Sequence, residues 1–187
     1  HCEDSSLVAG GVMNEGWVAT RLGLRGVPAS SEEVLVARDI ALAEQTGGRL
    51  HICHISTAGA VELVRRARDR GLRVTAEVTP HHLTMSDEWV AGAPDGAWSP
   101  LGPKAYDTST RVNPPLRTRR DAEALALALA EGVIDCVATD HAPHDSVSKA
   151  TTYQDAAPGL SVLETALGSL MSLVHAGKLT LPVLVER

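Results

Sequence analysis

The chain has 187 residues, of which 44% are hydrophobic and 3% aromatic, and its formal net charge is −6 at pH 7. The high share of apolar residues excludes a disordered chain. No stretch is long and apolar enough to span a membrane, and no signal peptide is found. The lack of a block of basic residues argues against nucleic acid as a partner. The three scattered cysteines (Cys2, Cys53 and Cys136) form no disulfide framework, so we expect a reduced, cytoplasmic setting.

Helical and strand-forming stretches alternate along the chain. In order, the patterns predict a helix over Ser31–Gln45, a strand over Arg49–Ser56, a helix over Thr57–Arg70, a strand over Leu72–Thr79, a helix over Arg120–Glu131, a strand over Val133–Thr139 and a helix over Ser161–His175. Glu32 and Glu33 suit the first turn of the first helix. Such repeats indicate parallel strands with right-handed crossovers. A doubly wound sheet and half of a (β/α)₈ barrel, with a further strand ending at His1, both satisfy the pattern.

Two segments lack a helical or strand period. Trp89–Thr110 is rich in Gly, Pro and Ser and is predicted to be a surface loop or insertion. Asp145–Pro158 follows the last predicted strand and is either a lid over a site or an ordinary loop.

Polar, metal-competent side chains gather where the predicted strands end. These are His51 and His54, His81 and His82, and Asp140, His141 and His144. In a parallel barrel the carboxyl ends of the strands open on one face, so such groups converge there, and imidazole with carboxylate suits Zn²⁺. Because side chains alternate along a strand, only one of His51 and His54 can easily be a ligand, and His54 lies nearer the barrel mouth. The spacing leaves a metal site and a metal-free acid/base cluster equally open.

Five motifs resemble those of one enzyme family. The run ATDHAPHDSVSK (Ala138–Lys149) is similar to the C-terminal signature of dihydroorotases, and HCED, HICHIS, AEVTPHHL and RVNPPLR occur in the same order in bacterial class I dihydroorotases. The resemblance covers nearly the whole chain apart from the 89–110 loop. It implies that residues 1–187 form one partial domain, the end of strand 5 to strand 8 of a metal-dependent amidohydrolase (β/α)₈ barrel. Half a barrel is further expected to leave its sheet edges unpaired and one apolar strand face uncovered.

The resemblance also implies a binuclear zinc centre that interconverts (S)-dihydroorotate and N-carbamoyl-L-aspartate in pyrimidine (UMP) biosynthesis. His1 and His54 resemble ligands of the second metal, and Asp140 resembles a ligand of the first metal that doubles as general acid/base. The remaining ligands, an HxH pair and a bridging Asp or carboxylated Lys, are expected upstream of His1. A strand-rich extension is expected after Arg187. The segment alone is therefore expected to be inactive.

The family's substrate contacts also have counterparts in this chain. Four residues match groups that contact the substrate in the family: Asn113, His144, Pro158 and Gly159. Four further histidines receive no ligand role and are expected to be structural or to support ligands: His51, His81, His82 and His141. Besides the small-molecule substrate, a second copy of the chain or a transcarbamoylase remains open as a partner.

Three other functions compete with this one. A related dihydropyrimidinase, hydantoinase or allantoinase would use a similar set of metal ligands. A catalytically silent dihydroorotase-like subunit could act as a scaffold for a transcarbamoylase, although retention of His1, His54, Asp140 and His144 argues against it. A metal-free structural domain is the third alternative.

Overall fold

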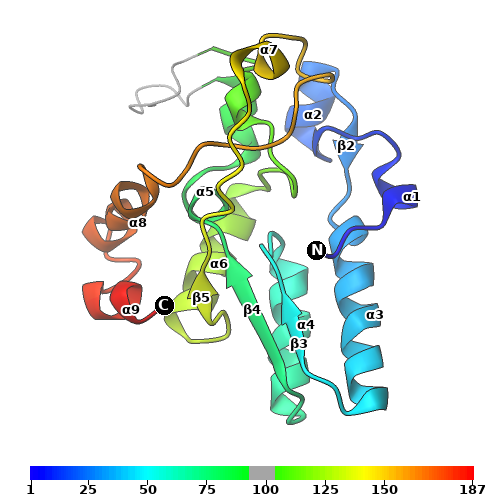
Figure 1. Ribbon diagram of the computed structural model, residues 1–187, viewed down its shortest axis with the longest axis vertical. Helices are drawn as coiled ribbons and strands as arrows, with labels where there is room; N and C mark the ends of the chain where they lie inside the picture. The colour runs from blue at the N-terminus through cyan, green and yellow to red at the C-terminus, as the bar shows by residue number, and fades with distance from the viewer. Residues whose placement is uncertain (93–103) are drawn as a thin grey trace.

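The computed structural model describes residues 1–92 and 104–187, which form an α/β architecture (Figure 1). The strands are β1 (Met13–Asn14), β2 (Gly26–Val27), β3 (Leu50–Ile52), β4 (Val74–Val78) and β5 (Cys136–Val137). The helices are α1 (Ser5–Val8), α2 (Trp17–Leu22), α3 (Ser30–Thr46), α4 (Ala58–Asp69), α5 (Pro80–Thr84), α6 (Arg119–Ala130), α7 (Ser146–Lys149), α8 (Ala166–His175) and α9 (Leu181–Glu186). Two 3₁₀ turns complete the elements: η1 (Asp87–Ala91) and η2 (Thr108–Thr110).

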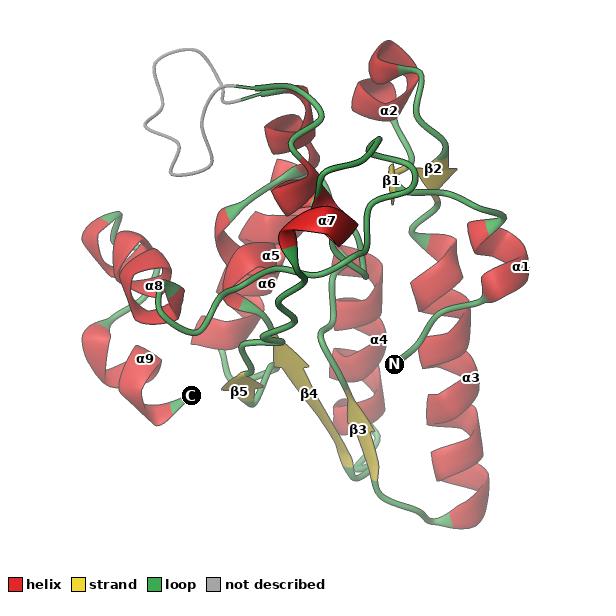
Figure 2. Ribbon diagram, turned by 45° about the horizontal axis from the view of Figure 1, so that its top comes forward, coloured by secondary structure: helices red, strands yellow, loops and turns green. Residues whose placement is uncertain are grey.

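The main sheet contains three parallel strands in the order β3–β4–β5. Helices α4 and α6 lie behind this sheet, and the chain that follows β5 runs upward in front of it toward α7 (Figures 1 and 2). The parallel arrangement predicted from the strand–helix repeats is confirmed. A second, two-stranded parallel sheet pairs β1 with β2 and was not predicted.

The predicted helices form because their end signals are local. Helix α3 ends at Gly47, which adopts the left-handed conformation (φ 65°) that glycine accepts without strain. Helix α4 begins after Thr57, whose side chain accepts a hydrogen bond from the Ala60 amide at 3.1 Å. A capping box between Thr118 and Asp121 starts α6. Each of these helices lies within two residues of its predicted span.

Burial along the central strand separates two faces of the sheet. Val74, Ala76 and Val78 are buried in the main hydrophobic cluster with residues of α4 and α6, whereas Thr75 is exposed and Glu77 half-buried. We name the face that carries Thr75 and Glu77 the open face. The expectation of an uncovered apolar strand face is wrong here, because the face left open is polar.

Two strands are shorter than predicted. The pairing of β3 ends at Ile52 rather than Ser56, and His54 has φ 36°. A non-glycine residue in this left-handed region cannot continue a strand. The start of β5 moves from Val133 to Cys136, because the amides of Val133 and Ile134 donate to the Ala128 carbonyl at the end of α6, at 2.9 and 3.2 Å.

The last long helix and the two irregular segments also differ from expectation. Helix α8 starts at Ala166 rather than Ser161, because the amides of Val162 and Leu163 donate to Nδ1 of His141 at 3.2 and 3.1 Å. Residues 93–103 of the predicted 89–110 loop lie outside the described residues, and its two ends form η1 and η2. In the 1–92 and 104–187 ranges, none of the helices combines the length and hydropathy needed to cross a bilayer.

Candidate metal and substrate site

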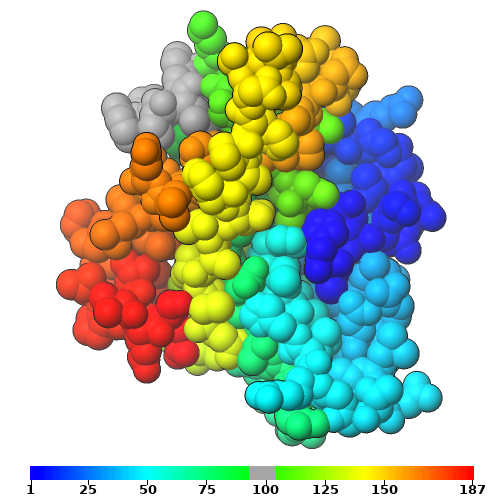
Figure 3. All heavy atoms as spheres, in the orientation of Figure 1, coloured from blue at the N-terminus to red at the C-terminus, as the bar shows by residue number. Residues whose placement is uncertain are grey.

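The candidate ligands come from three parts of the chain, and the structure brings two of them, His1 and His54, into contact near the carboxyl end of β3. The N-terminus lies beside the end of β3 (Figure 1), and the space-filling view shows the first residues in contact with this region (Figure 3). His1 Nδ1 and His54 Nε2 are 3.0 Å apart, and their rings meet edge to face with centroids 4.8 Å apart. Two residues separated by 53 positions are thus brought together, as the sequence motifs predicted.

The facing ring nitrogens of His1 and His54 match the donor set of a metal site. Each neutral imidazole offers one lone pair, so two nitrogens at this distance need either a shared proton or a cation between them. The other nitrogen of His54, Nδ1, is buried and has no hydrogen-bond partner among the described residues. An unpaired buried nitrogen calls for an explanation, and a further hydrogen-bonding group or ion near the ring would provide it.

The electrostatics favour a neutral His54. Burial lowers the pKa of this imidazole below its usual value, while the charge of Asp140 acts in the opposite direction. A neutral imidazole keeps its lone pair, which is the form that binds metals. The charge of Asp140 acts on His54, but among the described residues His1, His54 and Asp140 do not form a group whose ligand atoms all lie within 4.8 Å of one another.

Both His54 and Asp140 depend on a strained backbone. Their left-handed conformations cost about 1–3 kcal/mol each and persist only where surrounding contacts enforce them. The His54 amide donates to Oε1 of Glu77 at 3.4 Å, which helps to hold this turn. The turn also breaks the side-chain alternation that the sequence argument used to separate His51 from His54.

The four predicted substrate contacts form a second group. His144 Nε2 donates to the carbonyl of Pro158 at 3.0 Å, and the Gly159 amide donates to the carbonyl of Arg111 at 2.9 Å. Asn113 and Pro158 both line a hollow of about 90 Å³. A Cβ atom at Gly159 would lie 2.5 Å from the Ala142 carbonyl oxygen and 2.8 Å from His144 Nε2, so only glycine fits there.

The histidines of the TPHH motif are buried beneath the site. His82 donates from Nε2 to the carbonyl of Pro114 at 3.0 Å and accepts at Nδ1 from the Thr79 hydroxyl at 2.8 Å, so both of its nitrogens are used within the fold. His81 is 3% exposed, and neither of its ring nitrogens has a partner among the described residues. Burial, with a smaller contribution from His54, lowers the pKa of His81 to about 4.

This pKa predicts acid sensitivity of the fold. Because folding lowers the pKa of His81 from 6.5 to about 4, the unfolded chain binds more protons in this range, and stability falls as the pH falls from 6.5 toward 4. The loss from His81 approaches roughly 3 kcal/mol at pH 4. Urea unfolding of the full-length protein between pH 7 and pH 4 should give a shallower pH dependence for His81→Gln. The exposed variant His175→Gln should keep the wild-type dependence, and an unchanged slope in His81→Gln would contradict the assignment.

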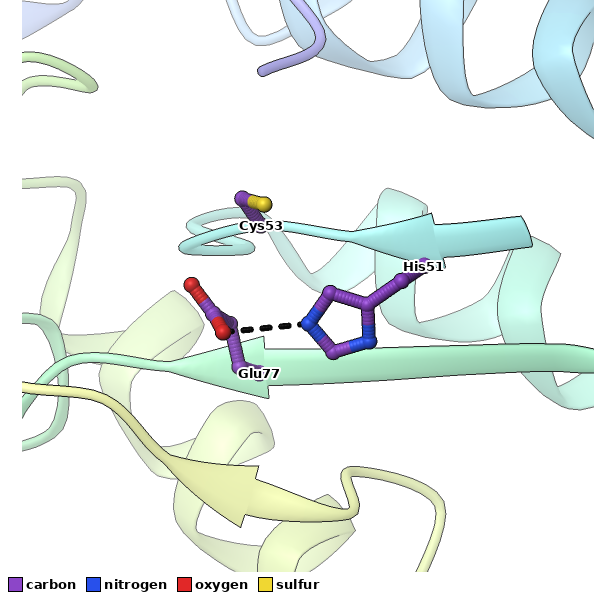
Figure 4. Close-up of side chains that lie close together, drawn as sticks. All are labelled: His51, Cys53 and Glu77. Carbon is purple, nitrogen blue, oxygen red and sulfur yellow. Dashed lines mark hydrogen bonds and ion pairs between the residues drawn. The ribbon is translucent and has the colours of Figure 1, made fainter.

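One group of residues was missed by the sequence argument. Ligand atoms of His51, Cys53 and Glu77 lie within 4.8 Å of one another on the open face (Figure 4). The argument considered only strand ends, whereas Glu77 lies inside β4. A charged residue within a predicted strand was the available signal, because such residues are seldom buried without a partner.

Several solved structures with a similar fold belong to one class of enzymes. The chain superimposes over its whole length on L-hydantoinase (dihydropyrimidinase) from Arthrobacter aurescens, with a TM-score of 0.78 and 26% identity, covering 40% of that chain. The dihydropyrimidinase from Brevibacillus agri gives a TM-score of 0.76 at 23% identity, again covering 40% of that chain. The fold is that of hydantoinase-type amidohydrolases.

Sequence relatives narrow this class to one family. Residues 1–60 match the family model described as Dihydro-orotase-like. A dihydroorotase of Pelotomaculum thermopropionicum is 56% identical over 96% of this chain and 39% of its own length. A dihydroorotase of a Thermoanaerobacter species is 50% identical over 100% of the chain and 40% of its own length. The chain belongs to the dihydroorotase-like family and spans about two fifths of the length of these relatives.

Proposed function

We propose that the full-length protein containing residues 1–187 is a zinc-dependent dihydroorotase, which interconverts (S)-dihydroorotate and N-carbamoyl-L-aspartate. The observation that carries the proposal is the pairing of His1 with His54 at 3.0 Å, within reach of the Asp140 charge, in a chain about 50% identical to dihydroorotases. The structural relatives named as hydantoinases are only 23–26% identical, so they support the fold more than the substrate.

The proposed barrel is supported by strand order and by the open face. Consecutive parallel strands β3, β4 and β5 are neighbours, as in a (β/α)₈ barrel, without the reversal of order that marks a doubly wound sheet. We assign residues 1–187 to one partial domain, with 89–110 as an insertion. The open face would then line the barrel interior.

The metal ligands follow from the residue types that meet. His1 and His54 would hold one zinc ion and Asp140 the other, with further ligands from outside residues 1–187. Bound zinc lowers the pKa of a water molecule and polarises a carbonyl group. These effects address two difficulties of hydrolysing an amide in neutral water: water is a poor nucleophile, and the amide carbonyl is a poor electrophile.

Asp140 is the proposed acid/base group. Its carboxylate would accept the proton of the attacking water as the new C–O bond forms. The same carboxyl group would then give this proton to the ring nitrogen as the C–N bond breaks. One group thus serves both steps, and the reverse reaction uses it in the opposite order.

Asn113, His144, Pro158 and Gly159 would hold the substrate. Nε2 of His144 donates to the Pro158 carbonyl, so Nδ1 would contact a substrate carboxylate only when it too carries a proton, in the imidazolium form. The Asp145–Pro158 segment, which contains one of these residues, is tied to Thr108: Lys149 Nζ donates to the Thr108 carbonyl at 3.0 Å, and the Thr108 hydroxyl donates to the Lys149 carbonyl at 2.8 Å. These contacts support a fixed wall rather than a moving lid.

Gly159→Ala tests the substrate assignment. The added methyl group must displace His144 or the backbone at Ala142, so kcat/KM for dihydroorotate hydrolysis should fall roughly 10- to 100-fold. Gly168→Ala is the matched control, because a Cβ at this position of α8 meets no atom within 4 Å. It should leave kcat/KM nearly unchanged. Equal kcat/KM values for the two variants would remove Gly159 and His144 from the substrate site.

The direct test compares the full-length protein with residues 1–187 alone. Zinc-loaded full-length protein should hydrolyse dihydroorotate, and the segment should show little hydrolysis and weak zinc binding because it supplies only part of the ligand set. A full-length protein that binds a transcarbamoylase but hydrolyses nothing would support the silent-subunit alternative instead. Preference for dihydrouracil or hydantoin over dihydroorotate would assign the protein to the hydantoinase type.

A further inference from the structure

A second group of potential metal ligands lies on the open face, apart from His1, His54 and Asp140. It consists of His51 in β3, Cys53 directly after β3, and Glu77 in β4 (Figure 4). Their ligand atoms, one nitrogen, one sulfur and one oxygen, all lie within 4.8 Å of one another. In residues 1–187 the side chain of His51 is 40% exposed and that of Glu77 is 20% exposed, and in the proposed barrel both would face the interior.

The strand register explains this juxtaposition. His51 lies opposite Thr75 in the parallel pairing of β3 with β4, and Glu77 follows two residues later on the same face. His51 therefore reaches along the sheet to Glu77, and Cys53 lies beside both. No loop has to move to bring the three together.

Thr75 fixes how His51 presents its ring. The Thr75 hydroxyl donates to the Leu50 carbonyl at 3.4 Å, so it accepts the 2.8 Å bond from Nδ1–H of His51. Nε2 then points at Oε2 of Glu77, 3.0 Å away. An orienting partner on the far nitrogen is the arrangement that metal-binding histidines adopt in proteins.

The space between Nε2 and Oε2 must hold a positive species. With Nδ1 protonated, the lone pair of a neutral His51 would face a carboxylate lone pair, which is repulsive unless a proton or a metal cation lies between them. A tetrahedral zinc ion with bonds of about 2.0–2.3 Å separates its ligand atoms by about 3.3–3.8 Å. The Nε2–Oε2 pair, 3.0 Å apart, reaches this spacing through a shift of a few tenths of an ångström, and Sγ of Cys53, which lies within 4.8 Å of both atoms, would move closer by up to about 1 Å.

We propose that His51, Cys53 and Glu77 bind a borderline divalent cation such as Zn²⁺, at a site separate from His1, His54 and Asp140. The mixture of imidazole, thiolate and carboxylate selects this class over Mg²⁺ or Ca²⁺, which prefer oxygen ligands alone. Three protein ligands leave a fourth position for water. The site joins the end of β3 to β4, and through Glu77 Oε1 it also supports the His54 backbone.

Cobalt substitution distinguishes this site from the proposed zinc centre. The full-length protein is stripped of metal with a chelator and titrated with Co²⁺, and only a thiolate ligand gives a sulfur-to-cobalt charge-transfer band in the near ultraviolet. We expect this band in the wild type and in the His54→Asn/Asp140→Asn double variant, and its loss in Cys53→Ser. Cys136→Ser is the matched control: Cys136 lies opposite Glu77 on β5, outside the group of three, and its loss should leave the band intact.

Glu77→Gln should weaken cobalt binding at the thiolate site by about 10-fold or more, since it removes a charged ligand. A band that survives Cys53→Ser, or that disappears in the His54→Asn/Asp140→Asn variant, would overturn the proposal. Because the band does not depend on turnover, absence of dihydroorotate hydrolysis would defeat the proposed function without affecting this result.

A second measurement avoids variants altogether. The wild-type protein is alkylated with iodoacetamide with and without Zn²⁺, and the modified cysteines are identified by peptide mapping. Zinc should protect Cys53 and leave the labelling of Cys136 unchanged. Equal labelling of Cys53 in both conditions would overturn the proposal.

Discussion

Replacing Asp140 by Asn in the full-length protein is expected to lower kcat for dihydroorotate hydrolysis by about 10² or more, because the variant has no carboxylate to accept and return the proton. The amide has nearly the same shape, and Asp140 is exposed, so the fold should persist. Steady-state kinetics with circular dichroism as a check on folding would measure both effects.

Asp69→Asn provides the control for Asp140→Asn. Asp69 is an exposed carboxylate at the end of α4, remote from the carboxyl ends of the strands, and its substitution should change kcat by less than twofold. A near-normal kcat in Asp140→Asn would show that another group carries the proton. Dihydroorotate hydrolysis by the wild type would still support the proposed reaction in that case.

Replacing Glu32 by Ala is expected to lower the free energy of unfolding by about 3–5 kcal/mol, because it leaves buried charge and buried donors without a partner. Glu32 is 3% exposed and accepts from the Ser56 and Thr57 amides at 3.0 and 3.2 Å and from both of their hydroxyls. Arg117, also 3% exposed, donates to Ser56 Oγ at 3.2 Å and to the Val27 carbonyl at 2.7 Å. The network fixes the two residues that lead from His54 into α4.

Glu62→Ala is the matched surface control for Glu32→Ala. Glu62 pairs with Arg66 one helical turn away at 2.7 Å, and both side chains are largely exposed. Such pairs contribute about 0.3–0.5 kcal/mol. Urea unfolding of the full-length protein measures both variants, and a loss below about 1 kcal/mol in Glu32→Ala would show that the network is dispensable.

The sequence predicted the helices well because their signals are local. Gly47 ends α3 and Thr118 starts α6, and both signals are readable without knowledge of tertiary contacts. The end of β3 was predicted too far along the chain, since the left-handed turn at His54 is held by a contact with Glu77, 23 residues away. Propensity alone does not encode such turns.

Only the part of the candidate site that lies within the family motifs could be predicted from the sequence. The pairing of His1 with His54 followed from the resemblance and is reproduced in the geometry. Glu32 was interpreted as a favourable charge in the first turn of its own helix, yet its carboxylate caps the start of another helix, α4. Its true partners lie 24 and 25 residues away, a distance that no local pattern reports.

The polar character of the open face affects the electric field at the proposed centre. In the proposed barrel this face forms the floor below the metals, and Glu77 places a carboxylate one hydrogen bond from His54. Glu77 also faces His51, and the positive species that lies between them offsets the charge of the carboxylate. This floor would therefore add little net charge below the proposed metals. In the proposed barrel, the anionic substrates dihydroorotate and N-carbamoyl-aspartate would be held by the metals and by groups at the barrel mouth, above an interior filled by packed side chains.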